Sequence, residues 1–191
     1  MSGCGVPDQE EAAVEERAIE SIVVADFDSG EKPNNLDGDF GAWDRDPEDK
    51  TQWASDQFSQ DERLGDDGYA VKISYDVDSP NTAFNGFWMK LAALDLRGFE
   101  NLTFYVKGDE KDGYTTRFKV ELKNRSEASR YLVRGVTTSW TKVTIPLDKF
   151  KDISQWDKMD EFVIVFDDMN VTKKTGSIYI DEVEFEKAPT N

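Results

Sequence analysis

The sequence contains no histidine and a single cysteine, Cys4. These absences exclude the Ser–His–Asp and Cys–His catalytic arrangements, the usual zinc ligand sets and any disulfide bond within the chain. The hard ligands that remain are carboxylate and carbonyl oxygens, which favour calcium or magnesium over transition metals. Any metal site in this chain is therefore expected to be built from oxygen ligands.

Long apolar runs and positive charges are also scarce. No stretch approaches the length of a transmembrane helix. The 40 Asp and Glu residues outnumber the 23 Lys and Arg residues, which gives a formal net charge of −17. Because nucleic acid and anionic membrane surfaces would repel such a chain, neither is an expected partner. The acidity fits either solubility outside the cytoplasm or cation binding.

The residues that are present suffice for one domain with a real core. The chain has 191 residues, of which 38% are apolar and 12% aromatic. Residues 1–20 are acidic and lack aromatic residues, so we expect a solvated tether, with a short helix over Glu10–Ile19 as the alternative. The predicted organisation is a tether at 1–20, a folded domain at 21–187 and a tail at 188–191.

The opening "SGC" around Cys4 resembles the end of a bacterial lipobox, in which the cysteine is lipidated. The basic and hydrophobic regions of a signal peptide are missing from the sequence as written. A chance cysteine near the N-terminus is the alternative. We expect an extracytoplasmic, cell-surface or periplasmic lipoprotein, or a secreted protein, with Cys4 as the only route to a membrane.

From residue 21 onward the sequence is typical of short strands separated by turns. The expected strands are Ile22–Phe27, Tyr69–Asp76, Phe84–Ala92, Leu102–Lys107, Thr115–Lys123, Arg130–Val136, Thr141–Pro146, Glu161–Phe166 and Ser177–Glu186. No long helical period follows residue 20, although "PLDKFKDI" can hold one turn. About nine strands without interleaved helices predict an all-β antiparallel β-sandwich or jelly roll.

Two aspartates fall at positions where alternation predicts core residues. In "GSIYIDEVEFE", strict alternation groups Asp181 with Val183 and Phe185, and Asp26 shares its phase with Val24. A bare carboxylate in a core is costly, so each must have a partner. The partner is either a hard cation or, if both residues lie at strand ends, solvent and nearby backbone amides.

The succession of strands resembles a known group of domains. It runs through "VADFDSG", "GYAVKISYDV", "LDLRGFENLTFYVKGD", "FKVELKN", "SWTKVTIPLDKF" and "GSIYIDEVEFE", and covers roughly residues 21–187. The chain is similar to galactose-binding-like β-sandwich carbohydrate-binding modules, especially those of family 11, and to the related domain of complex I intermediate-associated proteins. The resemblance implies a structural calcium between the first and last strands, at Asp26, Asp28 and Asp181.

The same resemblance implies a sugar-binding cleft across the concave sheet. Sugars bind flat aromatic faces flanked by planar hydrogen-bonding groups. The matching candidates are Tyr105, Arg117, Arg130, Arg134, Trp88, Asp167 and Asp168, with the loop residues Trp43 and Trp53 as further stacking walls. For each residue alone a structural role is the alternative: Trp88 can belong to the core, and exposed arginines commonly balance nearby acids.

These patterns favour a monomeric, non-catalytic module that binds a polysaccharide or oligosaccharide. The alternative is a protein-interaction or assembly factor of the complex I-associated type that uses the same face. Acidic pairs such as Asp167 and Asp168, or Asp157 and Asp160, could form a glycosidase pair, but acids are so abundant that such pairs arise by chance. We therefore expect no enzyme activity.

Overall fold

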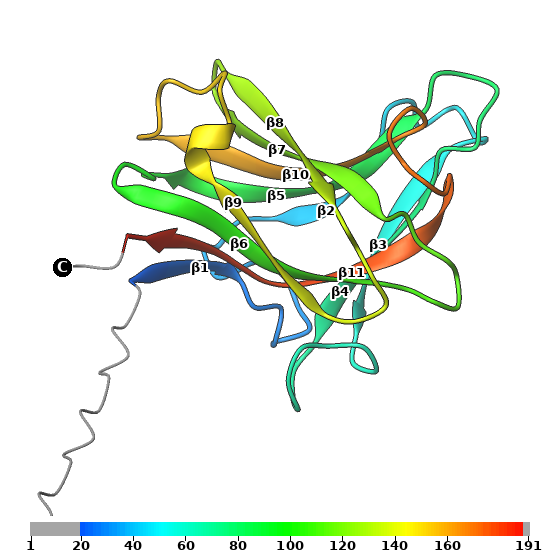
Figure 1. The fold of residues 1–191 in the computed structure, drawn as a ribbon, viewed down its shortest axis with the longest axis horizontal. Coiled ribbons are helices and arrows are strands. Elements are labelled where there is room, and N and C mark those ends of the chain that lie inside the picture. Colours follow the sequence, from blue (N-terminus) through cyan, green and yellow to red (C-terminus); the bar gives the residue numbers. More distant parts are fainter. Residues whose placement is uncertain (1–19, 189–191) are drawn as a thin grey trace, which may run out of the picture.

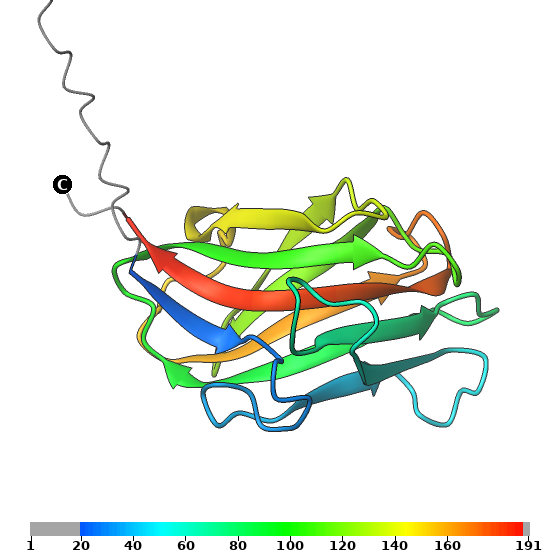
Figure 2. The same ribbon diagram turned by 90° about the horizontal axis from the view of Figure 1, so that it is seen from below.

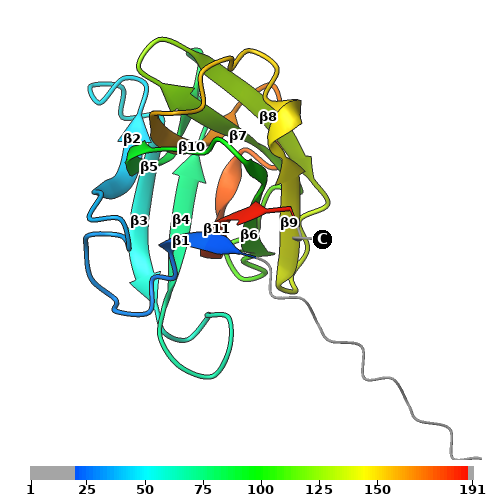
Figure 3. The same cartoon turned by 90° about the vertical axis from the view of Figure 1, so that its left-hand side faces the viewer.

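The computed structural model describes residues 20–188, which form two antiparallel sheets packed face to face (Figures 1 and 3). The predicted β-sandwich is therefore confirmed. Cys4, the helix expected over Glu10–Ile19 and most of the expected tether and tail lie outside the described residues. Within residues 20–188, no helix has the length and apolar character needed to cross a membrane.

Six strands form the first sheet and five form the second. The six-stranded sheet contains β1 (Ser21–Ala25), β3 (Trp53–Ser59), β4 (Ala70–Asp76), β6 (Phe99–Gly108), β9 (Thr141–Pro146) and β11 (Thr175–Lys187). The five-stranded sheet contains β2 (Phe40–Asp44), β5 (Phe84–Leu94), β7 (Arg117–Asn124), β8 (Ala128–Arg134) and β10 (Met159–Asp167). A single 3₁₀ turn, η1 (Leu147–Lys149), follows β9 and matches the turn expected in "PLDKFKDI".

The order of strands in space differs from their order in the chain. The six-stranded sheet runs β3-β4-β11-β6-β9, with β1 paired to β11, and the five-stranded sheet runs β2-β5-β10-β7-β8. Consecutive strands such as β5 and β6 therefore belong to opposite layers. Figure 2 shows β1 beside β11, so the first and last strands of the domain are neighbours.

The core lies between the sheets and is rich in aromatic side chains. Tyr75 of β4 stacks on Phe166 of β10, with ring centroids 4.0 Å apart and planes inclined by 12°. The Tyr75 hydroxyl donates a hydrogen bond to the carbonyl oxygen of Lys173, which satisfies the one polar atom of this pair. Both side chains are fully buried, as are Phe104 and Phe162, which cross the interface edge to face.

Two strands were missed by the sequence analysis, which treated Trp43 and Trp53 as loop residues. Trp43 lies in β2 and Trp53 begins β3. Both strands lie at sheet edges and contain small or polar residues, as in "FGAWD" and "WASDQFS", so neither shows a long apolar alternation. The other nine strands were predicted correctly, with small differences at their ends.

The predicted alternation in the last strand was wrong. Ile178 and Ile180 face the core, and Asp181 lies in the outward phase. A β-bulge follows, with Glu182 at a φ of 50°, and it shifts the phase so that Val183 and Phe185 turn inward. Asp181 is nevertheless only 2% exposed.

The phase predicted for Asp26 was also wrong. Strand β1 ends at Ala25, and its pairing with β11 is irregular between Val23 and Ala25. Val24 and Ala25 are both buried, whereas Asp26 lies beyond the strand and is half-buried. Its carboxylate accepts hydrogen bonds from the backbone amide of Asp28 and from the side chain of Asn35.

Candidate functional site

The outer face of the five-stranded sheet carries an aromatic group at its β2–β5 side. Trp43 lies opposite Gly86, and Gly41 lies opposite Trp88, so each indole ring faces a residue without a side chain. A Cβ at Gly86 would lie 1.9 Å from the carbonyl oxygen of Ile164 and 3.3 Å from the Trp43 indole nitrogen. Only glycine therefore fits there, and it allows the Trp43 ring to lie across the neighbouring strand.

Trp88 points outward and is half-buried, so the alternative of a core tryptophan is excluded. The residues on either side of it, Phe87 and Met89, are the ones that enter the core. A hollow of about 410 Å³ lies beside it and is lined by Trp43, Trp88, Lys90, Lys123, Glu161 and Val163. This combination of an aromatic wall and charged hydrogen-bonding groups can hold a sugar ring.

An adjoining hollow of about 590 Å³ extends the first one toward the end of the sheet. The two share Lys90, Lys123 and Glu161. Ala92 and Ala93 line the second hollow with φ angles of 53° and 56°, a left-handed conformation that is strained for residues other than glycine. The hollows together form an open groove across the ends of β5, β7 and β10.

The three predicted arginines lie on the same face, at its β7–β8 side. Arg117 lies directly opposite Arg134, and Arg130 lies opposite Glu121. Arg130 and Arg134 are exposed, whereas Arg117 is half-buried and its Nε donates a hydrogen bond to the carbonyl oxygen of Asn170. The structure thus brings together Trp88, Trp43 and these arginines on one face.

Asp167 is the last residue of β10, and Asp168 begins the turn that follows it. The Asp167 carboxylate forms an ion pair of 2.9 Å with Lys119 and accepts a hydrogen bond of 2.6 Å from the Asn170 side chain. Burial alone would raise the pKa of Asp167, but the lysine and the amide outweigh it and hold the pKa below its usual range. Asp168 donates its backbone amide to the carbonyl oxygen of Ala83.

Tyr105 does not join this group. It lies on β6 in the six-stranded sheet, where its neighbours across the ladders are Asp181 and Lys142. Its side chain faces outward, as predicted, but on the opposite side of the sandwich. Trp53 also lies on the six-stranded sheet, opposite Asp76, and is 42% exposed.

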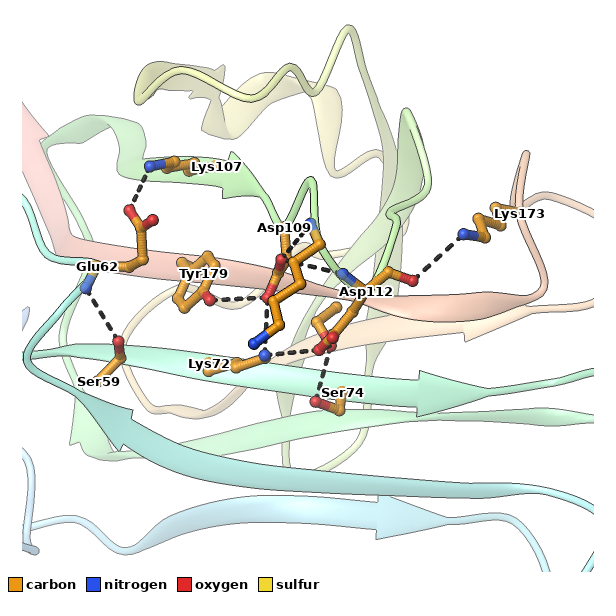
Figure 4. Close-up of polar contacts among 11 residues, drawn as sticks. Ser59, Glu62, Lys72, Ser74, Lys107, Asp109, Asp112, Lys173 and Tyr179 are labelled. Atoms are coloured by element: carbon orange, nitrogen blue, oxygen red, sulfur yellow. Dashed lines mark hydrogen bonds and ion pairs between the residues drawn. The ribbon is translucent and has the colours of Figure 1, made fainter.

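The outer face of the six-stranded sheet carries a polar network (Figure 4). The Lys72 ammonium lies 2.7 Å from the Asp109 carboxylate and 2.6 Å from that of Asp112, and the Tyr179 hydroxyl donates to Asp109 at 2.8 Å. Beside this network, Lys107 forms an ion pair with Glu62. Each of the three carboxylates, Glu62, Asp109 and Asp112, thus has a lysine partner within the protein.

Burial and pairing act against each other at Asp109. Burial alone would raise its pKa, but Lys72 and the Tyr179 hydroxyl outweigh that effect and lower the pKa to about 2. The Tyr179 pKa is raised to about 12 by burial and by its hydrogen bond to Asp109. The network is therefore a structural one, with its donors and acceptors already occupied.

A group of carboxylates lies where the first and last strands meet. Asp181 accepts hydrogen bonds of 2.9 Å from the backbone amides of Leu64 and Glu182. Burial, and then the nearby charges of Glu182 and Asp28, raise its pKa to about 7 despite those hydrogen bonds. The core position predicted for Asp181 required a partner for its carboxylate, and two backbone amides supply part of that partner.

The predicted metal ligands do not form a ready-made metal site. In the described part of the chain, no three carboxylate, cysteine or histidine side chains are grouped so that they could hold a metal ion. Asp26 is engaged by Asn35, while Asp28 lies close enough to Asp181 to raise its pKa. Within residues 20–188, none of these three aspartates has a lysine or arginine within 4.0 Å.

Sequence reasoning missed the lysines and the glutamate of the hollow, Lys90, Lys123 and Glu161. They lie on three different strands, β5, β7 and β10, and the alternation within one strand does not say which strands are its neighbours in space. The apolar phase formed by Phe87 and Met89 was the signal that could have oriented Trp88 outward.

Comparison with known families gives a match over most of the chain. The model of a family described as "Carbohydrate binding domain 30" matches residues 34–187. A search of curated proteins found no match.

Solved structures similar to this one include carbohydrate-binding modules. A family 11 module from Clostridium thermocellum, solved with a β-1,3-1,4-mixed-linked tetrasaccharide, superposes with a TM-score of 0.67 at 15% identity, covering 91% of this chain and 99% of that one. The family 11 module of the cellulosomal cellulase Lic26A-Cel5E of the same organism gives 0.65 at 17% identity, covering 91% and 98%. The CBM22-1 xylan-binding domain of Paenibacillus barcinonensis Xyn10C gives 0.53 at 13% identity, covering 94% and 100%. At these identities the likeness supports the fold.

Proposed function

Because this chain belongs to the carbohydrate binding domain 30 family, we propose that it is a non-catalytic module that binds a polysaccharide on the outer face of its five-stranded sheet. The observation that carries this location is the hollow lined by Trp43, Trp88, Lys90, Lys123 and Glu161. Binding needs no acid or base, only a preformed surface with stacking and hydrogen-bonding groups.

The chemistry of the hollow supports a sugar ligand. The indole rings of Trp43 and Trp88 offer apolar faces to the CH groups of a pyranose ring. The Lys90 ammonium lies 2.5 Å from Glu161 and 5.6 Å from the Trp88 ring centroid, so this pair borders the aromatic wall. Both charged groups can exchange part of their hydration for sugar hydroxyls at little cost, since hydroxyls donate and accept as water does.

The test is retention on immobilised glycans, with mixed-linkage glucan, cellulose, xylan and galactan among them. The Trp88→Ala variant is expected to lose retention, because it removes the wall of the hollow without touching the core. Loss of a central aromatic contact typically costs ~2 kcal/mol or more, about 30-fold in affinity. Unchanged retention of Trp88→Ala would place the ligand elsewhere. Silence of the native protein across a broad glycan panel, together with capture of a specific protein, would favour the assembly-factor alternative.

A structural calcium remains part of the proposal, at the carboxylates near the β1–β11 pair. Asp28 and Asp181 would supply oxygen ligands, with Asp26 and the bulge residue Glu182 adding negative charge. The support is electrostatic: burial and neighbouring carboxylates raise the pKa of Asp181, and a bound cation would relieve both effects. The ion would fasten the two ends of the domain and would not touch the sugar.

We also propose that the module works outside the cytoplasm, where structural polysaccharides are found. Cys4 would serve as the lipid anchor of a surface form, and its mature N-terminus can be identified by mass spectrometry. A monomer suffices for binding on one sheet face. Incubation with chromogenic glycosides tests the proposed lack of catalysis, and turnover that disappeared in one aspartate variant would contradict it.

A further inference from the structure

The outer face of the five-stranded sheet is cationic, although the chain as a whole is strongly acidic. Six cations against four carboxylates occupy its outward strand positions: Lys90, Arg117, Lys119, Lys123, Arg130 and Arg134 against Glu121, Asp160, Glu161 and Asp167. Over the whole sequence, 40 acidic residues outnumber 23 basic ones. The sign of the charge is therefore reversed on the face that holds the aromatic hollow.

Three of the four carboxylates of this face are already paired with its lysines. Asp167 lies 2.9 Å from Lys119, and Glu161 lies 2.5 Å from Lys90. Glu121 lies 3.7 Å from Lys123. These contacts leave the arginines as the excess positive charge.

In the part of the chain that the structure describes, no carboxylate lies within 4.0 Å of the guanidinium groups of Arg117, Arg130 and Arg134. Arg117 and Arg134 are direct cross-strand neighbours, an arrangement of like charges that destabilises a sheet. An external anion would turn this repulsion into attraction, because a guanidinium group binds carboxylate and sulfate through paired N–H donors.

The spacing of the two halves of the face suits a chain-like ligand. Trp88 on β5 and Arg130 on β8 lie in one cross-strand row, separated by Val163 of β10 and Glu121 of β7. Three strand spacings of ~4.8 Å separate their backbones by about 14 Å. A glycan crossing the strands would stack one ring at the tryptophans and bring substituents of later rings to the arginines.

Resting on the proposed function, we propose that the polysaccharide bound here is an acidic one, carrying carboxylate or sulfate groups. The net negative charge of the protein does not prevent this. At physiological salt the Debye length is ~8 Å, and the acids of the opposite sheet lie beyond a layer about 10 Å thick. The local arginines therefore dominate what a ligand on this face experiences.

The experiment compares ligands that differ only in charge. Polygalacturonate and its fully methyl-esterified form share one backbone, and sulfated and desulfated carrageenan form a second such pair. Binding of the native protein is measured by titration calorimetry at about 0.05 M and about 0.5 M NaCl. The proposal expects at least one charged glycan to bind about tenfold more tightly than its neutral partner at low salt, with the difference shrinking at high salt.

Substitutions test whether the preference for charged glycans comes from the arginines of the five-stranded sheet. Arg130→Gln/Arg134→Gln is expected to bind the charged glycan about tenfold more weakly, which corresponds to ~1.4 kcal/mol. The control, Lys111→Gln/Lys151→Gln, removes the same charge at exposed positions outside the strands and is expected to bind like the native protein. Thermal melting checks that both variants fold.

Each other outcome is decisive. Binding of neutral glycans that depends on Trp88 but not on the arginines would overturn the acidic ligand and leave the proposed function standing. Absence of binding to any glycan, neutral or charged, would overturn the proposed function itself. Single-stranded DNA binding as tightly as the best acidic glycan would show that the face selects anions in general, which overturns the assignment to a polysaccharide.

Discussion

The two outer faces of this sandwich contain similar residues but differ in how the charged side chains are paired. Both carry lysines, carboxylates and aromatic rings. On the six-stranded sheet, Lys72 is held between Asp109 and Asp112, and Tyr179 completes the network (Figure 4). On the five-stranded sheet, the tryptophans border a hollow, and the arginines have no acidic partner within the described residues. Composition alone does not mark a binding surface, whereas unmatched donors beside an aromatic hollow do.

The largest effect is expected where the network is broken. Lys72→Met leaves the Asp109 carboxylate nearly buried and without its cation, so the free energy of unfolding should fall by about 2–4 kcal/mol. Lys142→Met is the matched control on the same face, because the Lys142 side chain is 43% exposed against 16% for Lys72, so its pair with Glu186 should contribute less than ~1 kcal/mol. Urea denaturation measures both, and glycan binding should survive in both.

The same network predicts a response to acid. The folded pKa of Asp109 is about 2, below its ordinary value of ~3.9 in an unfolded chain. The stability it contributes is therefore present above about pH 4 and is lost as the pH falls toward about 2. In Lys72→Met that contribution should be smaller throughout, and acid unfolding should begin at a higher pH. An acid midpoint unchanged by the substitution would contradict a structural role for the network.

The next effect is on binding. Trp88→Ala should weaken glycan affinity about 30-fold, ~2 kcal/mol, and leave the free energy of unfolding nearly unchanged because the indole is only half-buried. Lys72→Met should show the reverse, a lower stability with native affinity. Equal changes in glycan affinity and in the free energy of unfolding in both variants would contradict the assignment of binding to one face and stability to the other.

A smaller effect is expected at the carboxylates near β1 and β11. The folded pKa of Asp181, about 7, lies above its unfolded value of ~3.9, so the folded state loses stability as the pH rises from about 4 to about 7. With a chelator present, the melting temperature should fall by about 3–8 °C over that range, and Asp181→Asn should fall less.

Calcium provides the test of the ion at the same site. Added calcium should restore the melting temperature of the native protein at pH 8, because an ion that binds only the folded state stabilises it. It should not restore that of Asp181→Asn. A melting temperature indifferent to both chelator and calcium would contradict the proposed calcium and leave the sugar site unaffected.

The smallest effect is expected at Tyr105. Because it lies on β6, on the far side of the sandwich from the hollow, Tyr105→Ala should bind glycans like the native protein. Affinity electrophoresis with the native protein as reference is sufficient. A marked loss of binding would place the ligand on the six-stranded sheet.

Much of the fold could be predicted from the sequence, because alternation in long strands is a local property. Alternation in "RFKVELK" is enough to place Phe118, Val120 and Leu122 on one face, and all three are buried in the core. The bulge at Glu182 could not be foreseen, since nothing in "IDEVEF" distinguishes an inserted residue from a continuing strand. That single residue determines whether Asp181 faces in or out.

The site was only partly predictable, because strand order in space is not a local property. Tyr105 and Arg117 belong to strands that are consecutive in the chain, yet β6 and β7 lie in opposite sheets. Trp43 and Trp88 lie on paired strands, although β2 was not recognised. The three arginines do lie together, because β7 and β8 form a hairpin. A hairpin is the pairing that two strands adjacent in the sequence suggest.

The five tryptophans allow the most direct test of where the glycan binds. Trp43 and Trp88 lie on the five-stranded face, Trp53 and Trp140 on the six-stranded sheet or beside it, and Trp156 lines a hollow at one end of the sandwich. Their indole N–H signals can be followed by NMR while a glycan is titrated into the native protein. The account predicts that the signals of Trp43 and Trp88 shift with ligand and the other three do not. Shifts confined to Trp140 or Trp156 would contradict it.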